Sequence, residues 1–170
     1  GKTTTIRILL DLVRPSHGKA YLFGKDPRRD RSTLRRVGAL VEGAAFYPYL
    51  SGRANLELLR RMNGGKSQPI EGLLDRVGLK AHADDRFGSY STGMKQRLGI
   101  AASLLHDPDL VILDVPTNGL DPVGMVEMRD LIRSLVDRDG KTVFLSSHHL
   151  GEVEQICDRV AIIDNGHLLR

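Results

Sequence analysis

Apolar residues recur along much of the chain at spacings of three and four, which places them on one face of a helix. The first such run contains Ile6, Leu9, Leu10 and Val13, and Pro15 closes it. With the turn residues at their ends, runs of this kind predict helices over Thr3–Val13, Ala54–Met62, Ile70–Val77, Ser91–Leu105, Pro122–Val136 and Leu150–Ile156.

Short, unbroken apolar runs between these helices predict strands. Leu110–Leu113 is the strongest, because four consecutive apolar residues are typical of a strand buried on both faces. We expect Thr142–Leu145 to be buried in the same way. The other runs predict strands over Lys19–Phe23, Val37–Val41 and Val160–Ile163.

The order of these elements predicts the fold class. Strands and helices alternate between Leu110 and Ile163, which is typical of an α/β domain with a mainly parallel sheet flanked by helices. The middle of the chain is almost free of strands and is interpreted as a helical insertion. We therefore expect a sheet domain formed by residues 1–44 and 108–170, with a helical subdomain at 45–107. Because a helix-starting motif stands at residue 1, we also expect the natural protein to begin earlier, with N-terminal strands missing here.

Composition narrows the class of protein. The chain has 170 residues, of which 41% are hydrophobic and 27% charged, the balance of a soluble globular domain. No apolar run approaches the roughly 18 residues needed to cross a bilayer, so a membrane role would require a partner. Five arginines lie between Arg28 and Arg36, but no aromatic stacking platform accompanies them, and nucleic-acid binding is therefore not favoured.

The first candidate for chemistry is Gly1-Lys2-Thr3-Thr4, which matches the last residues of the phosphate-binding pattern G-x-x-x-x-G-K-[ST]. A helix that starts here offers free backbone N–H groups to an anion. Lys2 would reach the β- and γ-phosphates, and the Thr3 hydroxyl would bind Mg²⁺. The alternative is an ordinary helix start.

A second candidate is Asp114, which follows the buried run Leu110–Leu113 in the manner of a Walker B motif. A carboxylate at the end of such a strand would hold Mg²⁺. The alternative is an aspartate that caps a helix or a turn.

Three further motifs complete an ordered set. Tyr90–Leu98 is similar to the ABC signature, Asn118–Asp121 to the D-loop, and Ser146-Ser147-His148 to the segment with the switch histidine. With the phosphate and Walker B elements, they make the chain resemble the ATP-binding subunits of ABC transporters over nearly its whole length. The resemblance implies a P-loop NTPase-like fold.

The resemblance also implies a mechanism, in which two such domains bind ATP head to tail and drive a transmembrane permease. His148 would contact the γ-phosphate, and Asp121 would report across the interface. The protein would be cytoplasmic, on the inner face of the plasma membrane. The residues implied to clasp one nucleotide are Gly1, Lys2, Thr3, Thr4 and Asp114 of one subunit, with Ser91 and Gly93 of the other.

Val115 departs from the family pattern, which places a glutamate here to polarise the attacking water. Valine cannot accept a proton, and general-base catalysis is worth about 10²–10⁴-fold. We therefore expect severely slowed hydrolysis, with ATP binding retained. A sequencing error, a decayed gene or a partner that supplies the competent site are the alternatives.

Glu42 stands where the family has the Q-loop glutamine, and its carboxylate could face Mg²⁺. It is assigned a catalytic role with His148 but does not replace the missing base, because its place in the fold differs. The aromatic stretch Phe46–Leu50 is similar to that of drug and antibiotic-peptide exporters, where it would lie near the permease. It could equally pack the helical insertion.

The signature departs from the family at Thr92 and Met94, which replace Gly and Gln. Ser91 and Gly93 remain, so contact with the γ-phosphate is retained, while Thr92 would weaken nucleotide affinity modestly. Three hypotheses follow: an exporter ATPase, an ATP-binding switch that barely hydrolyses, and a soluble ABC ATPase. The last is disfavoured, because it would require a tandem domain or a long coiled coil.

Overall fold

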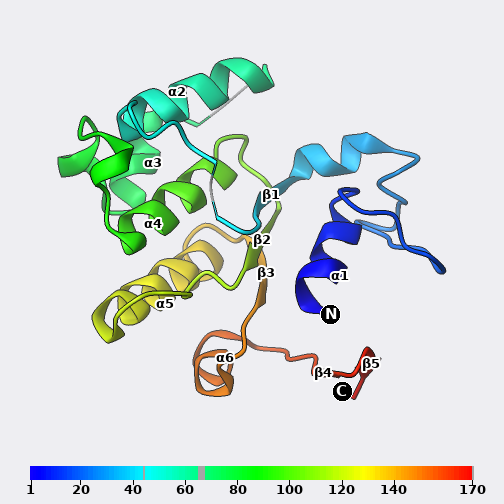
Figure 1. Cartoon of the computed structure of the whole chain (residues 1–170). Helices are drawn as coiled ribbons and strands as arrows, with labels where there is room; N and C mark the ends of the chain where they lie inside the picture. The colour runs from blue at the N-terminus through cyan, green and yellow to red at the C-terminus, as the bar shows by residue number, and fades with distance from the viewer. Residues whose placement is uncertain (44, 65–67, 170) are drawn as a thin grey trace.

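The computed structural model describes residues 1–43, 45–64 and 68–169. Its centre is a parallel sheet of three strands in the order β1-β2-β3 (Figure 1). Leu40 lies opposite Leu113, and Asp114 lies opposite Ser146, so the carboxyl ends of the strands are level with one another. The strands of this sheet are β1 (Val37–Leu40), β2 (Leu110–Asp114) and β3 (Thr142–Ser146). The α/β class and the parallel sheet predicted from the sequence are confirmed.

β2 is buried on both faces, as its apolar run predicts. Val111, Ile112 and Leu113 are all fully buried between the helix layers. The expectation that the third strand is equally buried is wrong. β3 lies at the edge of the sheet, its residues alternate in exposure, and Phe144 is 43% exposed.

Helices cover both faces of the sheet. In Figure 1, α4 and α5 lie on one side and α1 on the other. α4 approaches β1 so closely that a Cβ on Gly38 would stand 2.0 Å from the Ser103 carbonyl oxygen, so only glycine fits there. The long helices are α1 (Lys2–Leu9), α2 (Gly52–Asn63), α4 (Thr92–Ser103) and α5 (Pro122–Asp137), and the shorter ones are α3 (Ile70–Arg76) and α6 (Leu150–Ile156).

The described residues between β1 and β2 form α2, α3 and α4 with two short 3₁₀ helices, Lys80–His82 and Phe87–Ser89. We call residues 45–107 the helical region. Its interior is rich in leucine because each helix turns an apolar face inward. The fully buried leucines here include Leu56, Leu73, Leu74, Leu79 and Leu98.

Two predicted elements near the N-terminus differ from the structure. The first helix ends at Leu9 rather than Val13, because Asp11 takes a left-handed conformation with φ 57°. Lys19–Phe23 is not a strand: Leu22 pairs only with Lys25, in an isolated bridge. Another 3₁₀ helix, Arg31–Arg36, leads into β1.

The predicted strand Val160–Ile163 is likewise absent as a member of the sheet. Its residues are exposed, and its end enters the hairpin of β4 (Ile163–Asp164) with β5 (His167–Leu168), where the Ile162 carbonyl also accepts from the Leu169 N–H at 2.8 Å. An apolar run favours burial, but a strand forms only where another strand lies within hydrogen-bonding reach. Among the described helices, none is both long and apolar enough to span a membrane.

Candidate functional site

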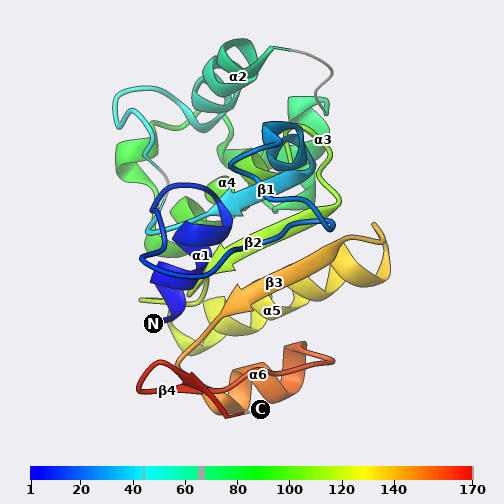
Figure 2. The same cartoon turned by 90° about the vertical axis from the view of Figure 1, so that its right-hand side faces the viewer.

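The candidate site lies at the carboxyl ends of the parallel strands, where Figure 2 shows the three arrowheads on the same side as the N-terminus of α1. We call this carboxyl-terminal side of the three strands the sheet edge, as distinct from the outer strands. It is defined by Glu42 after β1, Asp114 and Val115 at the end of β2, and Ser146 and His148 at the end of β3. Ligands of open α/β sheets bind beyond the carboxyl ends of their strands.

α1 begins at this edge without a capping side chain. Gly1 is its N-cap residue and makes no side-chain cap bond, so the first backbone amides are not occupied by a cap. Lys2 is exposed and Thr3 is half-buried. An uncapped helix N-terminus beside a lysine is suited to bind an anion.

Asp114 is oriented by the neighbouring strand. The Ser146 hydroxyl donates to Asp114 Oδ1 at 2.5 Å, and the same hydroxyl accepts from the Val115 N–H at 3.1 Å. The Val115 N–H also donates to the Ser146 carbonyl oxygen at 3.1 Å. The bonding partner of Asp114 is thus a serine at a strand end and not the start of a helix.

Val115 takes a left-handed backbone conformation, with φ 47°. This region is an outlier for a β-branched residue and costs about 1–3 kcal/mol. The side chain is half-buried and has no group that could accept a proton. The structure therefore places a strained apolar residue next to Asp114.

Glu42 is also left-handed, with φ 56°, and its side chain is largely exposed. It forms an ion pair with Arg7 of α1, so it links the end of β1 to the helix that starts at Lys2. The structure thus brings the phosphate-end helix and the carboxylate after β1 together.

The signature residues lie away from α1. Ser91 caps α4 by accepting from the Met94 N–H at 3.2 Å. α4 and α1 lie on opposite sides of the sheet (Figure 1), so a single chain does not bring Ser91 to Lys2. A Cβ on Gly93 would lie 3.6 Å from Leu120, which places the signature beside the segment Asn118–Asp121.

Asp121 caps α5, because its Oδ1 accepts from the Gly124 N–H at 3.0 Å. His148 and His149 are exposed, and their ring centroids are 4.0 Å apart. Both rings line a cavity of about 480 Å³ between α5 and α6. Its other lining residues are Met125, Arg129, Leu150, Gly151, Glu152 and Gln155.

The aromatic stretch Phe46–Leu50 divides into packed and exposed residues. Phe46 packs edge-on against Phe87 with the ring centroids 5.0 Å apart. Tyr47 and Tyr49 lie 5.6 Å from each other and are 48% and 67% exposed. Phe46 therefore packs against the helical region, which is one of the two roles that the sequence left open. Tyr47 and Tyr49 lie at the surface.

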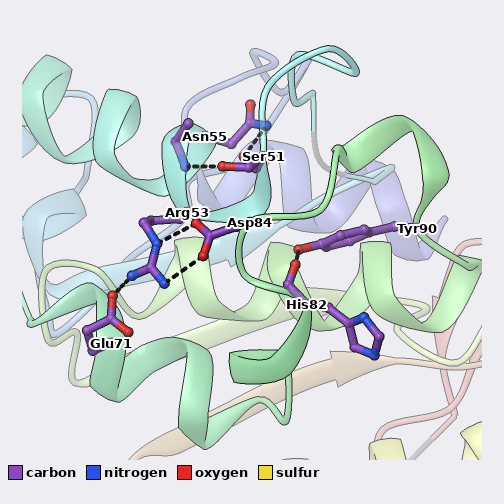
Figure 3. Close-up of polar contacts among 8 residues, drawn as sticks. Ser51, Arg53, Asn55, Glu71, His82, Asp84 and Tyr90 are labelled. Carbon is purple, nitrogen blue, oxygen red and sulfur yellow. Dashed lines mark hydrogen bonds and ion pairs between the residues drawn. The ribbon is translucent and has the colours of Figure 1, made fainter.

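Asn55 holds this stretch in place, a role that no pattern in the sequence signalled. It is 1% exposed, accepts from the Tyr47 N–H at 2.8 Å, and donates to the carbonyls of Tyr47 and Leu50. It also donates to the Ser51 carbonyl at 3.0 Å (Figure 3). The stretch is joined in turn to the segment before the signature, because the Phe87 N–H donates to the Leu50 carbonyl at 2.8 Å.

Arg53 and Tyr90 make further contacts with the segment before the signature (Figure 3). Arg53 pairs with Glu71 and Asp84, and its guanidinium lowers the pKa of the Asp84 carboxyl. The Tyr90 hydroxyl donates to the His82 carbonyl at 2.6 Å, and burial raises the pKa of Tyr90. The residue before Ser91 is thus anchored in the helical region.

The sequence matches a known protein family over most of its length. Residues 1–118 match the model described as ABC transporter. The chain belongs to the ABC transporter family. The resemblance drawn from the ordered motifs is thereby confirmed, and ATP is the nucleotide that this family binds.

Relatives within the ABC transporter family include transport proteins for peptide antibiotics. The chain is 48% identical to the bacitracin transport ATP-binding protein BcrA of Bacillus licheniformis, with 99% of this chain and 56% of that protein covered. It is 42% identical to the lantibiotic transport ATP-binding protein SrtF of Streptococcus pyogenes, covering 99% of this chain and 72% of that protein. The chain thus spans little more than half the length of BcrA.

Solved structures of the family share the fold. CbiO1 of Clostridium perfringens, part of the transporter complex cbiONQ, superposes with a TM-score of 0.85 at 24% identity, covering 100% of this chain and 71% of that one. The ATP-binding cassette MJ0796, in a dimeric post-hydrolysis state with ADP and Pi, gives 0.83 at 23% identity, covering 100% and 79%. At this level of identity the likeness concerns the fold.

Proposed function

We propose that the chain binds and hydrolyses ATP to drive the export of a peptide antibiotic through a transmembrane permease. The observation that carries this proposal is the convergence of the uncapped α1 N-terminus with Asp114 at one sheet edge, in a chain 48% identical to a bacitracin transport protein. The names of the relatives favour transport over a switch that only binds ATP. In this role the protein is cytoplasmic and peripheral on the inner face of the plasma membrane.

The sheet edge supplies the nucleotide contacts. Gly1 and Thr4 contribute the start of α1, and Lys2 neutralises the β- and γ-phosphates. Thr3, Asp114 and Glu42, which is paired with Arg7 here, would hold Mg²⁺, whose charge would offset that of the phosphates. The donor set suits this ion: these are hydroxyl and carboxylate oxygens, and Ser146 bonds one oxygen of Asp114, so the other is available.

The second half of the site comes from another subunit. Because α1 and α4, which begin at Lys2 and after Ser91, lie on opposite sides of the sheet (Figure 1), we expect a head-to-tail pair to place Ser91 and Gly93 against the γ-phosphate. His148 contacts that phosphate from the end of β3, and Asp121 lies at the interface between the subunits. In this arrangement residues 1–44 and 108–170 form the core and 45–107 the helical subdomain.

Val115 sets the rate of this ATPase. With valine at the position of the general base, no side chain there can take the proton of the attacking water, and the proton has to pass to a phosphate oxygen or to solvent. We expect slow hydrolysis at the site that contains Val115, with ATP binding retained. A partner subunit with a complete site would supply the faster turnover.

The proposal is tested with the full-length gene product. Calorimetry should show MgATP binding that Lys2→Ala abolishes and that Lys19→Ala, at an exposed position, leaves unchanged. Expressed with its permease in a bacitracin-sensitive host, the protein should raise resistance, and Lys2→Ala should not. MgATP binding without any change in resistance to bacitracin or a lantibiotic would refute the assigned substrate class. Absence of MgATP binding would refute the whole proposal.

A further inference from the structure

Glu152 of α6 is a buried carboxylate that the proposed site does not use. It is 7% exposed, and burial of a carboxylate is costly unless hydrogen bonds compensate for lost water. The Thr117 hydroxyl donates to Glu152 Oε2 at 2.8 Å, and the Ser147 hydroxyl donates to the same oxygen at 3.2 Å. Thr117 is itself 5% exposed, so this bond lies away from water, where charge-assisted bonds are strong.

The two hydroxyls belong to different loops. Thr117 lies in the loop after β2, between Val115 and Asp121, while Ser147 immediately precedes His148 in the loop after β3. The Ser147 hydroxyl also accepts from the His149 N–H at 3.0 Å. One carboxylate oxygen therefore connects the loop beside Asp114 to the backbone around the histidine.

The other oxygen of Glu152 has a different environment. Oε1 is buried and has no hydrogen-bond partner among the described residues. A buried acceptor without a partner lowers stability, so such a group calls for an explanation other than stability. A carboxylate that positions two loops for a ligand is such an explanation.

We propose that Glu152 is a positioning residue that makes the loop after β2 and the loop after β3 move as one unit, so that Asp121 and His148 reach the nucleotide together. The proposal rests on the proposed function, because it assigns these loops to an ATP site. It adds a residue that touches neither nucleotide nor Mg²⁺ and acts through Thr117 and Ser147.

A substitution on one loop with a readout on the other separates this role from a merely structural one. In the full-length protein without nucleotide, Thr117→Val removes the hydroxyl and keeps the shape of the side chain. Backbone amides at 146–149 should then exchange about tenfold faster or more, as expected for the loss of a bond to a charged group. Thr117→Ser keeps the hydroxyl and should exchange like the unsubstituted protein.

Glu152→Gln should raise exchange at the same amides, whereas the matched control Glu154→Gln, at an exposed position on the same helix, should not. If Glu152→Gln fails to fold, the two Thr117 variants still decide the question. Unchanged exchange at 146–149 in Thr117→Val would overturn the proposal. This readout needs no ATP, so it holds or fails independently of the proposed function.

Kinetics supply the second test. In a Val115→Glu background, Thr117→Val and Glu152→Gln should each lower kcat about 10- to 100-fold while the KM for ATP stays within twofold, because misplacement of groups around the phosphate impairs the reaction more than binding. Faster exchange with unchanged kcat would show that the tie only stabilises the fold, and would overturn the positioning role. A rise in KM at constant kcat would overturn it as well.

Discussion

The helical region and the sheet edge differ in the types of residue that adopt a left-handed backbone conformation. Among the described residues of the helical region, the left-handed positions are Gly64, Gly78 and Asp107, residue types that adopt this conformation at little cost. At the sheet edge the left-handed positions are Glu42 and Val115, where it is costly.

The helical region and the sheet edge also differ in how their polar groups are hydrogen-bonded. In the helical region α2 and α4 begin with serine caps, Ser51 and Ser91, and the buried Asn55 bonds with both its amide nitrogen and its oxygen. At the sheet edge α1 starts uncapped and Lys2 is exposed. The comparison shows that the caps of α2 and α4 and the bonds of Asn55 favour stability, whereas the sheet edge combines strained residues with an uncapped helix start and an exposed lysine that suit a bound anion.

The largest expected effect tests the chemistry of the sheet edge. In the full-length protein with its partner subunits, Val115→Glu should raise ATP hydrolysis about 10²–10⁴-fold, because a carboxylate can take the proton of the attacking water. Phosphate release at saturating MgATP measures this. Adding His148→Ala should remove most of the gain. Equal rates with valine and glutamate would show that Val115 does not limit hydrolysis.

The next effect concerns the helical region. Asn55→Ala should lower the free energy of unfolding by about 3 kcal/mol, because it leaves the Tyr47 N–H and the carbonyls of Leu50 and Ser51 without their buried partner. Urea unfolding followed by circular dichroism measures the loss. Arg61→Ala, at an exposed ion pair of the same helix, should change little. Similar values for both variants would contradict the assigned role of Asn55.

A smaller effect isolates the strain at the sheet edge. Val115→Gly should raise the free energy of unfolding by about 1 kcal/mol, because glycine adopts φ 47° freely and this outweighs the lost packing of a half-buried side chain. Val111→Gly, in the fully buried and extended part of the same strand, should instead cost about 3 kcal/mol. If both variants destabilise equally, position 115 is not strained.

The smallest effect is a pH dependence in the helical region. Burial, with help from Asp85 and Asp84, raises the pKa of Tyr90 above its ordinary 10.0. The unfolded tyrosine ionises first, so the stability contributed by Tyr90 is complete below about pH 10 and is lost as the pH rises through the higher folded pKa. Tyr90→Phe should therefore lower Tm by a few degrees at pH 8, with a difference that shrinks above pH 10. A constant difference across this range would contradict the assignment.

Much of the fold and the motif order follows from the pattern of residues. The buried run before Asp114 predicts a central strand, and the structure places β2 there. The equally apolar Val160–Ile163 does not join the parallel sheet, because its end pairs instead with β5 in a separate two-stranded hairpin. The local apolar pattern indicates which side chains favour burial. Whether the segment joins the sheet also depends on which strand lies beside its backbone.

In the candidate site, too, some features follow from the sequence and others only from the tertiary structure. The sequence by itself determined the order of the five motifs, the start of a helix at Gly1 and the presence of valine where a general base is expected. Only the tertiary structure decided that Val115 is left-handed and that Ser146 orients Asp114. It alone joined Thr117 to Glu152, which is 35 residues away in the chain. The reason is physical: side-chain periodicity is a local property, whereas a hydrogen bond between two loops depends on which strands the topology makes neighbours.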